Sequence, residues 1–280
     1  MTTAHTLVGS AAAATTAHRE ALYRDGVVAL PGCFPPQWAD RLDRDFDAAF
    51  AEASERPEGL IGRGPHRYYF AVHPEQISGF VDLITHPTVT ALCREMLGPD
   101  YLFVELGFDV PWPGATTQPW HRDFPTPDAT AQQGRLTSLA FNLTTVDVTP
   151  DLAPFEIAPG TQFDDGSAFD HGMFPPTQVY PRYDGLASRR YPHRGDVSAR
   201  SALTLHRGTE HLGDQRRPVL ILGAVTGDTD PADTDIHDLF VTEQFHSRLP
   251  ESVQKRLRCT VVDQLTPITQ RHDIEGLVMG

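Results

Sequence analysis

A change of pattern near residue 101 restricts the fold more than any other feature of the chain. Before it, apolar residues recur at three- and four-residue spacing and predict amphipathic helices over 36–56 and 87–97, after a shorter helix at 16–25 and a strand at 27–30. After it, short apolar segments lie between proline- and glycine-rich turns, and they predict strands at 101–110, 136–146, 155–158, 202–206 and 218–225. Helices are predicted again over 235–246 and 250–257, before a last strand at 259–262.

Short strands at even spacing, with helices at both ends, predict a mainly β chain with helical additions, built on a double-sheet jelly roll. We find no internal repeat and no linker, so residues 16–280 are predicted to form a single domain after a disordered segment 1–15. The segments 59–74 and 163–194 show no clear period. They are candidate lids, because long irregular loops inside a compact domain are usually functional or disordered.

The charge balance and the lysine content exclude several classes of protein. The chain has 37 acidic and 23 basic residues, a formal charge of −14, which argues against nucleic acid as a partner. Its single lysine, Lys255, lies on a predicted exposed helix face. Mechanisms that need a lysine in a P-loop, a kinase strand or a Schiff base are therefore close to excluded.

Other features indicate a cytoplasmic protein that acts on a small molecule. No apolar run approaches the length of a membrane helix, and the N-terminus has no signal-peptide pattern, so no membrane partner is expected. The three cysteines are far apart and form no CxxC pair, which is typical of reduced thiols. The oligomeric state stays open.

The most informative motif is Gln118-Pro119-Trp120-His121-Arg122-Asp123. On a strand, alternate side chains point to the same face, so His121 and Asp123 converge while Trp120 and Arg122 point away. One imidazole and one carboxylate leave a metal site incomplete, and a histidine further along the chain has to complete it. The candidates are His171, His193, His206, His211, His237 and His246.

His206 is the favoured third ligand because it ends an apolar strand, whereas His211 lies in a polar turn. Two histidines and one carboxylate bind Fe(II) on one face and leave positions open for O2 and a co-substrate. The absence of nearby cysteines fits iron better than structural zinc. Arg217 begins the next apolar strand, and a hairpin would place its guanidinium beside the metal, where it could bind a carboxylate of a 2-oxo acid in bidentate fashion.

These residues, in this order, resemble the phytanoyl-CoA dioxygenase-type Fe(II)/2-oxoglutarate oxygenases. The matching elements lie between about residues 20 and 225: Asp25-Gly26-Val27-Val28-Ala29-Leu30-Pro31-Gly32, the 118–123 motif, Ala158-Pro159-Gly160-Thr161, Gly195-Asp196, and His206-Arg207-Gly208 through Arg217. The resemblance implies a double-stranded β-helix with His121, Asp123 and His206 as iron ligands. It also implies that Arg217 binds the distal carboxylate of 2-oxoglutarate.

The resemblance suggests further co-substrate contacts from Gln118 and Thr161, and from an arginine of the N-terminal region, Arg63 or Arg67. The chain departs from the family pattern in two places. Thr161-Gln162 stands where the family usually has Ser-His, and 210–214 lacks the usual Asn and Ser. These changes leave the predicted iron ligands intact.

We therefore predict an Fe(II)- and 2-oxoglutarate-dependent dioxygenase that hydroxylates a small organic molecule in specialised metabolism. Asp123 favours hydroxylation over halogenation, whereas desaturation, epimerisation and cyclisation use the same ligands and stay open. Residues from the two candidate lids are predicted to bind the substrate: Arg67, Tyr69, Phe169 and His171.

Three other functions would use some of the same motif residues. A kinase reading of His-Arg-Asp fails because the catalytic-loop Asn, the DFG motif and the strand lysine are all missing. A zinc hydrolase would use the same ligands but would not explain Arg217. The third is a non-catalytic jelly-roll binding protein, which would be supported if His206 turned away from His121.

Overall fold

The computed structural model describes residues 2–230, 237 and 239–270, with side chains described from residue 14. It begins with one long helix, α1 (Thr2–Asp25). The helix predicted over 16–25 is the C-terminal part of α1. The disorder predicted over 1–15 stays a prediction. Among the described helices, none is both long and apolar enough to cross a bilayer.

The predicted helices before residue 101 are confirmed. They are α2 (Pro36–Ser54) and α4 (Pro87–Leu97), with the shorter α3 (Phe80–Ile84) between them. Both α2 and α4 begin at a proline, which suits a first helical position because its missing N–H has no partner there in any case. One face of α2, including Trp38, Leu42 and Phe46, is buried.

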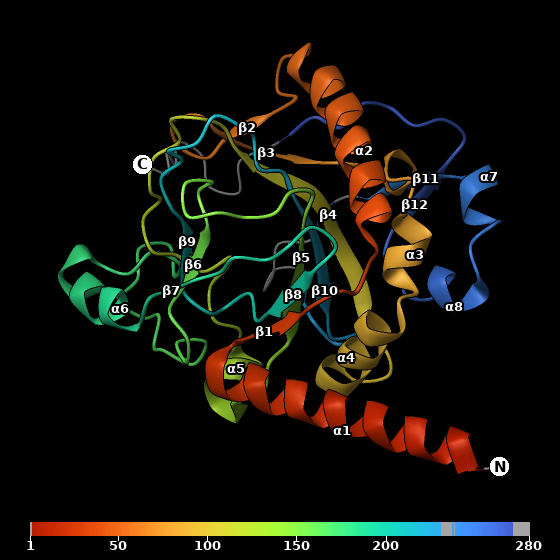
Figure 1. The fold of residues 1–280 in the computed structure, drawn as a ribbon, viewed down its shortest axis with the longest axis horizontal. Coiled ribbons are helices and arrows are strands. Elements are labelled where there is room, and N and C mark those ends of the chain that lie inside the picture. The colour runs from red at the N-terminus through yellow and green to blue at the C-terminus, as the bar shows by residue number, and fades with distance from the viewer. Residues whose placement is uncertain (1, 231–236, 238, 271–280) are drawn as a thin grey trace.

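A seven-stranded antiparallel sheet in the order β1-β8-β5-β10-β4-β3-β2 forms the centre of the molecule (Figure 1). Its strands are β1 (Val27–Leu30), β2 (Ile61–Gly62), β3 (Arg67–Ala71), β4 (Leu102–Pro111), β5 (Ser138–Thr144), β8 (Val197–Arg200) and β10 (Val219–Val225). Candidate lid 59–74 thus contributes the last two strands at one end of this sheet, with β2 at the edge.

The two faces of the large sheet have different surroundings because side chains alternate along each strand. On β5, Leu139, Phe141 and Leu143 are buried in the main hydrophobic core, as the sequence predicted. The helices α2, α3 and α4 lie on one side of the sheet in Figure 1. The alternate residues Ser138, Ala140, Asn142 and Thr144 face a cavity on the other side.

A three-stranded sheet, β7-β6-β9, lies on the cavity side. Its strands are β6 (Phe155–Ile157), β7 (Ser188–Arg189) and β9 (His206–Gly208). Candidate lid 163–194 contains α6 (Tyr180–Leu186), which stands out from the body next to this sheet (Figure 1). The two facing antiparallel sheets with helical additions are the predicted jelly-roll, or double-stranded β-helix, architecture.

Three predicted elements differ from the structure. The segment around His121 is not a regular strand, although it is extended and His121 forms a bridge with His206. The strand predicted over 202–206 is a turn up to residue 205, and β9 begins only at His206. The helix predicted over 235–246 is confirmed only at its end, where α7 (Glu243–His246) follows the strand β11 (Phe240–Thr242). Residues 235, 236 and 238 of that prediction lie outside the described residues. β11 pairs in parallel with β12 (Thr260–Val262), after the one-turn helix α8 (Glu251–Gln254).

Candidate metal centre and its cavity

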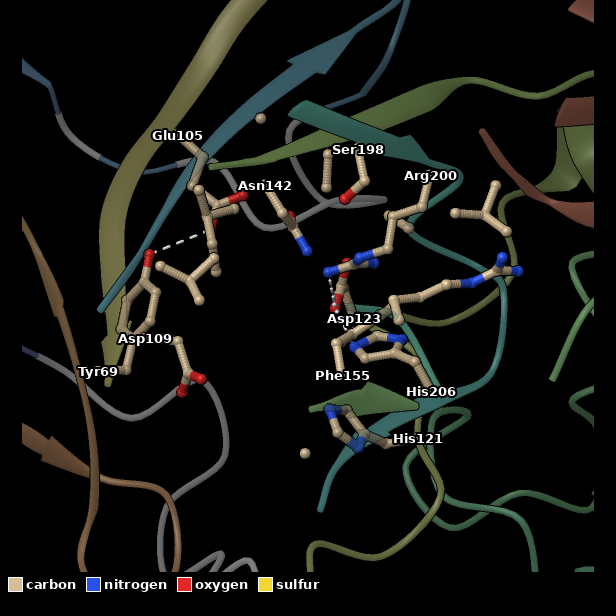
Figure 2. Close-up of a pocket in the computed structure, with 18 of the residues that line it drawn as sticks. Tyr69, Glu105, Asp109, His121, Asp123, Asn142, Phe155, Ser198, Arg200 and His206 are labelled. Atoms are coloured by element: carbon tan, nitrogen blue, oxygen red, sulfur yellow. Dashed lines mark hydrogen bonds and ion pairs between the residues drawn. The ribbon is translucent and has the colours of Figure 1, made fainter. Parts of the chain in front are cut away.

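A cavity of about 420 Å³ lies between the two sheets. His121, Asp123 and His206 line one side of it, and Tyr69, Glu105 and Asp109 lie across from them (Figure 2). The other candidate histidines, His171, His193, His211, His237 and His246, are not among its lining residues. Of the candidates proposed from the sequence, His206 alone therefore joins His121 and Asp123.

Backbone pairing brings the two histidines together although they are far apart in the chain. The His121 N–H donates to the His206 carbonyl at 3.0 Å, and the His206 N–H donates to the His121 carbonyl at 2.8 Å. The two rings are 4.4 Å apart between centroids. His206 therefore lies against His121. The non-catalytic alternative would be supported by the opposite arrangement, in which His206 turned away from His121.

Each imidazole is oriented by a backbone carbonyl. Nδ1 of His121 lies 2.9 Å from the Pro119 carbonyl, and Nδ1 of His206 lies 2.9 Å from the Thr204 carbonyl. Since a carbonyl only accepts, Nδ1 carries the proton in both rings and Nε2 keeps its lone pair. Burial lowers the pKa of both histidines. Both rings are thus in the neutral form that binds metals, with the second nitrogen engaged as in known metal sites.

Asp123 is the carboxylate of the cluster. Its Oδ1 lies 3.3 Å from Nε2 of His206, and its side chain, 27% exposed, borders the cavity. Burial opposes its ionisation, but the charge and the hydrogen bonds of the Arg200 guanidinium outweigh burial and hold the pKa of the Asp123 carboxyl well below its usual range. The group is an ionised oxygen donor at neutral pH.

The three side chains fit an iron ion in donor type, but they are not a closed cluster. Among the described residues, no three His, Cys, Asp or Glu side chains are already gathered tightly enough to hold a metal ion. His206 and Asp123 are in contact, whereas the His121 ring is tilted by 55° to that of His206 and stacks on Phe174 at 5.9 Å. The His121 ring is therefore the donor that has to adjust.

The cationic end of the cavity contains Arg217 and Arg67, which are 4% and 1% exposed. Arg67 is already paired, since it donates to Asp109 at 3.0 Å and to the Thr209 carbonyl at 3.1 Å. Nε of Arg217 has no hydrogen-bond partner among the described residues. A buried guanidinium that borders a cavity and keeps an Nε–H without a partner among the described residues is suited to a carboxylate ligand.

The position after the His206-Arg207 pair requires a glycine, Gly208, because the Arg67 side chain lies close to it. A Cβ at this position would lie 2.4 Å from Cζ of Arg67, far closer than van der Waals contact. Any larger residue would displace the Arg67 guanidinium from Asp109. The glycine thus leaves the space in which the second arginine is held.

The remaining predicted co-substrate contacts have different positions. Gln118 borders the cavity, but its amide is engaged: Oε1 accepts from the Gly208 N–H at 2.9 Å and Nε2 donates to the Arg63 carbonyl at 3.3 Å. Thr161 is fully buried and is not among the lining residues. Its hydroxyl donates to the Ala158 carbonyl and accepts from the Leu205 N–H. The predicted contact of Thr161 with the co-substrate is therefore replaced by a role in the backbone turn before His206.

Of the four predicted substrate contacts, Arg67 and Tyr69 line the cavity, whereas Phe169 and His171 do not. Phe169 packs under the Arg122 guanidinium at 4.7 Å, and the His171 side chain is half exposed. The same loop instead contributes Phe174 and Met173, together with 189–192. The residues of this loop that line the cavity are therefore other than the two predicted from the sequence.

Several residues that line the cavity were not predicted from the sequence. Arg200, Ser198 and Asn142 face the cavity from the large sheet, and Phe155 does so from β6 (Figure 2). The strand β8 was not predicted. Its alternation of buried Val197 and Ala199 with Ser198 and Arg200 was the available signal, but the strand has four residues only.

Comparison with known proteins places the chain in a family. The family model of phytanoyl-CoA dioxygenase (PhyH) matches residues 22–219, well over half of the chain. The chain therefore belongs to the phytanoyl-CoA dioxygenase family, an enzyme family whose cofactors are Fe(II) and 2-oxoglutarate. The family resemblance predicted from the motifs is confirmed.

Solved structures agree on the fold. The epimerase SnoN, in complex with Fe3+, alpha-ketoglutarate and nogalamycin RO, is 19% identical with a TM-score of 0.60, over 76% of this chain and 84% of SnoN. AviO1 from Streptomyces viridochromogenes Tue57 is 17% identical with a TM-score of 0.58, over 80% and 98% of the two chains. HygX from Streptomyces hygroscopicus, with nickel and 2-oxoglutarate bound, is 14% identical with a TM-score of 0.55, over 80% and 90%.

Proposed function

We propose that the chain is an Fe(II)- and 2-oxoglutarate-dependent dioxygenase that hydroxylates a small organic molecule in specialised metabolism. In this proposal His121, Asp123 and His206 hold the iron, and Arg217 binds the distal carboxylate of 2-oxoglutarate. Membership of the phytanoyl-CoA dioxygenase family supports the class of reaction.

The observation that carries the proposal is the joint placement of the three donors and Arg217 around one cavity. Both imidazoles keep Nε2 available because Nδ1 donates to a carbonyl. The Asp123 carboxylate is ionised, and Arg217 is a buried cation whose Nε has no partner among the described residues. A zinc hydrolase would have no use for such an arginine.

When bound, iron supplies the activation of O2, driven by oxidation of the co-substrate. The chain's own residues bind and orient. Arg217 and the Arg67–Asp109 pair define the cationic end of the cavity, where a dicarboxylate is expected to bind. The substrate then occupies the space between the metal ligands and the opposite wall of Tyr69 and Glu105 (Figure 2).

The proposal is tested by adding Fe(II) and 2-oxoglutarate to the protein without oxygen and recording the visible charge-transfer band of the chelate. We expect the band with the wild type and its loss in His206→Ala and in Arg217→Ala. A panel of candidate substrates is then scored by the shift of the band. No band with the wild type, or an unchanged band in both variants, contradicts the assignment.

Epimerisation is the second candidate, because the fold is similar to that of the epimerase SnoN. Desaturation and cyclisation would use the same donors. The mass of the product separates these reactions once a substrate is found: hydroxylation adds one oxygen atom, epimerisation leaves the mass unchanged, and desaturation and cyclisation each remove two hydrogens. A chain that binds the substrate but forms no succinate would support the non-catalytic alternative.

A further inference from the structure

Arg200 is a buried cation in direct contact with the carboxylate of the proposed iron site. It is 4% exposed and ends β8 with its side chain toward the cavity. Two nitrogens of its guanidinium donate hydrogen bonds to Asp123, at 2.6 Å to Oδ2 and 3.2 Å to Oδ1 (Figure 2). The two residues are 77 positions apart in the chain, so the tertiary fold alone creates this pair.

The two oxygens of Asp123 are not equivalent. Oδ1 faces Nε2 of His206 at 3.3 Å, whereas Oδ2 makes the shorter contact with Arg200. Two donors about 2.1 Å from one ion, at right angles to each other, lie about 3 Å apart. Oδ1 and Nε2 of His206 are close to that separation. Oδ1 makes only the longer of the two Arg200 contacts and is therefore the oxygen placed for a metal, whereas Oδ2 is held by the shorter one.

Neighbouring residues hold Arg200 in this position. β8 pairs with β5 so that Arg200 lies opposite Ala140, whose small side chain leaves the cavity surface open for the long arginine. The Phe155 ring packs 5.7 Å from Cζ of Arg200 and 5.2 Å from the His206 ring. One aromatic side chain thus contacts both the arginine and a proposed ligand.

We propose that Arg200 is a positioning residue that occupies Oδ2 of Asp123 and presents Oδ1 alone to the metal. A carboxylate that chelated with both oxygens would use one of the positions that the co-substrate, substrate and O2 require. By holding Oδ2, Arg200 keeps Asp123 a one-oxygen ligand and fixes its rotation. This inference rests on the proposed function, since it takes Asp123 and His206 as ligands.

The test measures metal binding rather than activity. Mn(II), which resists oxidation, is titrated calorimetrically into the wild type, Arg200→Gln and Arg200→Lys. We expect both variants to bind Mn(II) about 10–100-fold more weakly, because neither side chain can hold the two oxygens at once and outer contacts of this kind carry that much affinity. Arg200→Lys keeps the charge and guards against a variant that fails to fold. Arg194→Gln, which breaks an exposed arginine–aspartate pair, is the matched control with unchanged affinity.

A double-mutant cycle shows whether Arg200 acts through Asp123. In an Asp123→Ala background, Arg200→Gln should cause no further loss of Mn(II) affinity. Equal losses in both backgrounds, or full affinity in Arg200→Lys, would overturn the inference. A crystal structure of the Mn(II)-bound wild type with both Asp123 oxygens on the metal would do the same. A wild type that binds no Mn(II) would instead reject the proposed iron site itself.

Discussion

The Arg217 guanidinium is a buried positive charge that borders the cavity. Burial, together with the nearby Arg67 guanidinium, lowers the pKa of Arg217 to about 10. Among the neighbouring charges, only the Asp109 carboxylate raises the pKa of Arg217, and this carboxylate already pairs with Arg67. The folded state therefore carries a desolvated charge that a bound dicarboxylate would neutralise.

Arg217→Met is expected to stabilise the protein while it removes co-substrate binding. A methionine keeps the apolar volume and removes the buried charge, so the free energy of unfolding should rise by about 1–3 kcal/mol at neutral pH. The 2-oxoglutarate complex should fail to form. Urea unfolding and the anaerobic charge-transfer band measure the two effects. A loss of stability would mean that Arg217 is balanced within the protein.

The lowered pKa of Arg217 predicts that the stability of the folded protein depends on pH. This pKa is about 10 in the folded chain, below that of an ordinary arginine, so the unfolded chain holds more protons above pH 10. The destabilisation by Arg217 is therefore complete below pH 10 and fades as the pH rises above that value. The stability difference between Arg217→Met and the wild type should shrink above pH 10. A constant difference would contradict the lowered pKa.

Thr161→Val tests the corrected role of this residue. The substitution keeps the shape but leaves the Leu205 N–H and the Ala158 carbonyl without their buried partner, at a cost of about 1–3 kcal/mol. We expect lower stability in urea and an unchanged affinity of the folded protein for 2-oxoglutarate. Thr161→Ser keeps the hydroxyl and serves as the control. A selective loss of 2-oxoglutarate affinity would restore the prediction of a co-substrate contact.

The sequence predicted the donors because His121, Asp123 and His206 form a pattern with known chemistry. It did not predict Arg200 or Phe155, which have no motif of their own. Their positions follow from strand register, since Arg200 reaches Asp123 only through the pairing of β8 with β5 and β1. Thr161 matched the family pattern in sequence, but its hydroxyl is used by the backbone.

Among the elements, the long helices and the strands with clear alternation were predictable from periodicity. The failures are short elements whose structure depends on a partner. β11 has three residues, and its parallel pairing with β12 overrides the local preference for helix. The segment that contains His121 is extended only because it pairs with 202–208, where Ala202 and His206 accept its N–H groups.

That segment also connects the metal centre to α6. Trp120, on the side away from His121, is fully buried, and its Nε1 donates to Asp184 of α6 at 3.0 Å. Arg207 covers the Trp120 ring at 4.2 Å and also contacts Asp184 at 3.0 Å. Because side chains alternate along the extended segment, Trp120 points away from His121 and contacts Asp184 in candidate lid 163–194.

Asp184→Ala should loosen α6 without affecting the metal ligands. Trp120 would keep a buried N–H without a partner, so the local stability should fall by about 1–3 kcal/mol. We expect faster hydrogen exchange over 177–187 and an unchanged affinity for Mn(II). Asp170→Ala, which removes an exposed carboxylate of the same loop, is the control. Equal exchange in the two variants would show that the Asp184 contact does not hold the helix.

The whole molecule is held by a hydrophobic core that connects its N- and C-terminal parts. The core contains Leu22 of α1, Phe46 of α2, Cys93 of α4 and Leu257 after α8, together with the inner faces of β4, β5 and β10. Elements that share one core are expected to unfold together. This continuity supports the predicted single domain over 16–280, which a labelling experiment can test.

Cys93 reports on that cooperativity. It is fully buried, and burial raises its pKa, so its thiol should react only after the core opens. Cys33 and Cys259 are partly exposed, and burial raises the pKa of Cys33 to about 11. In a Cys33→Ser, Cys259→Ser background, the free energy from Cys93 labelling should equal that from urea unfolding. Labelling at a much lower free energy would mean that α4 opens as a separate unit, and the chain would then not unfold as one domain.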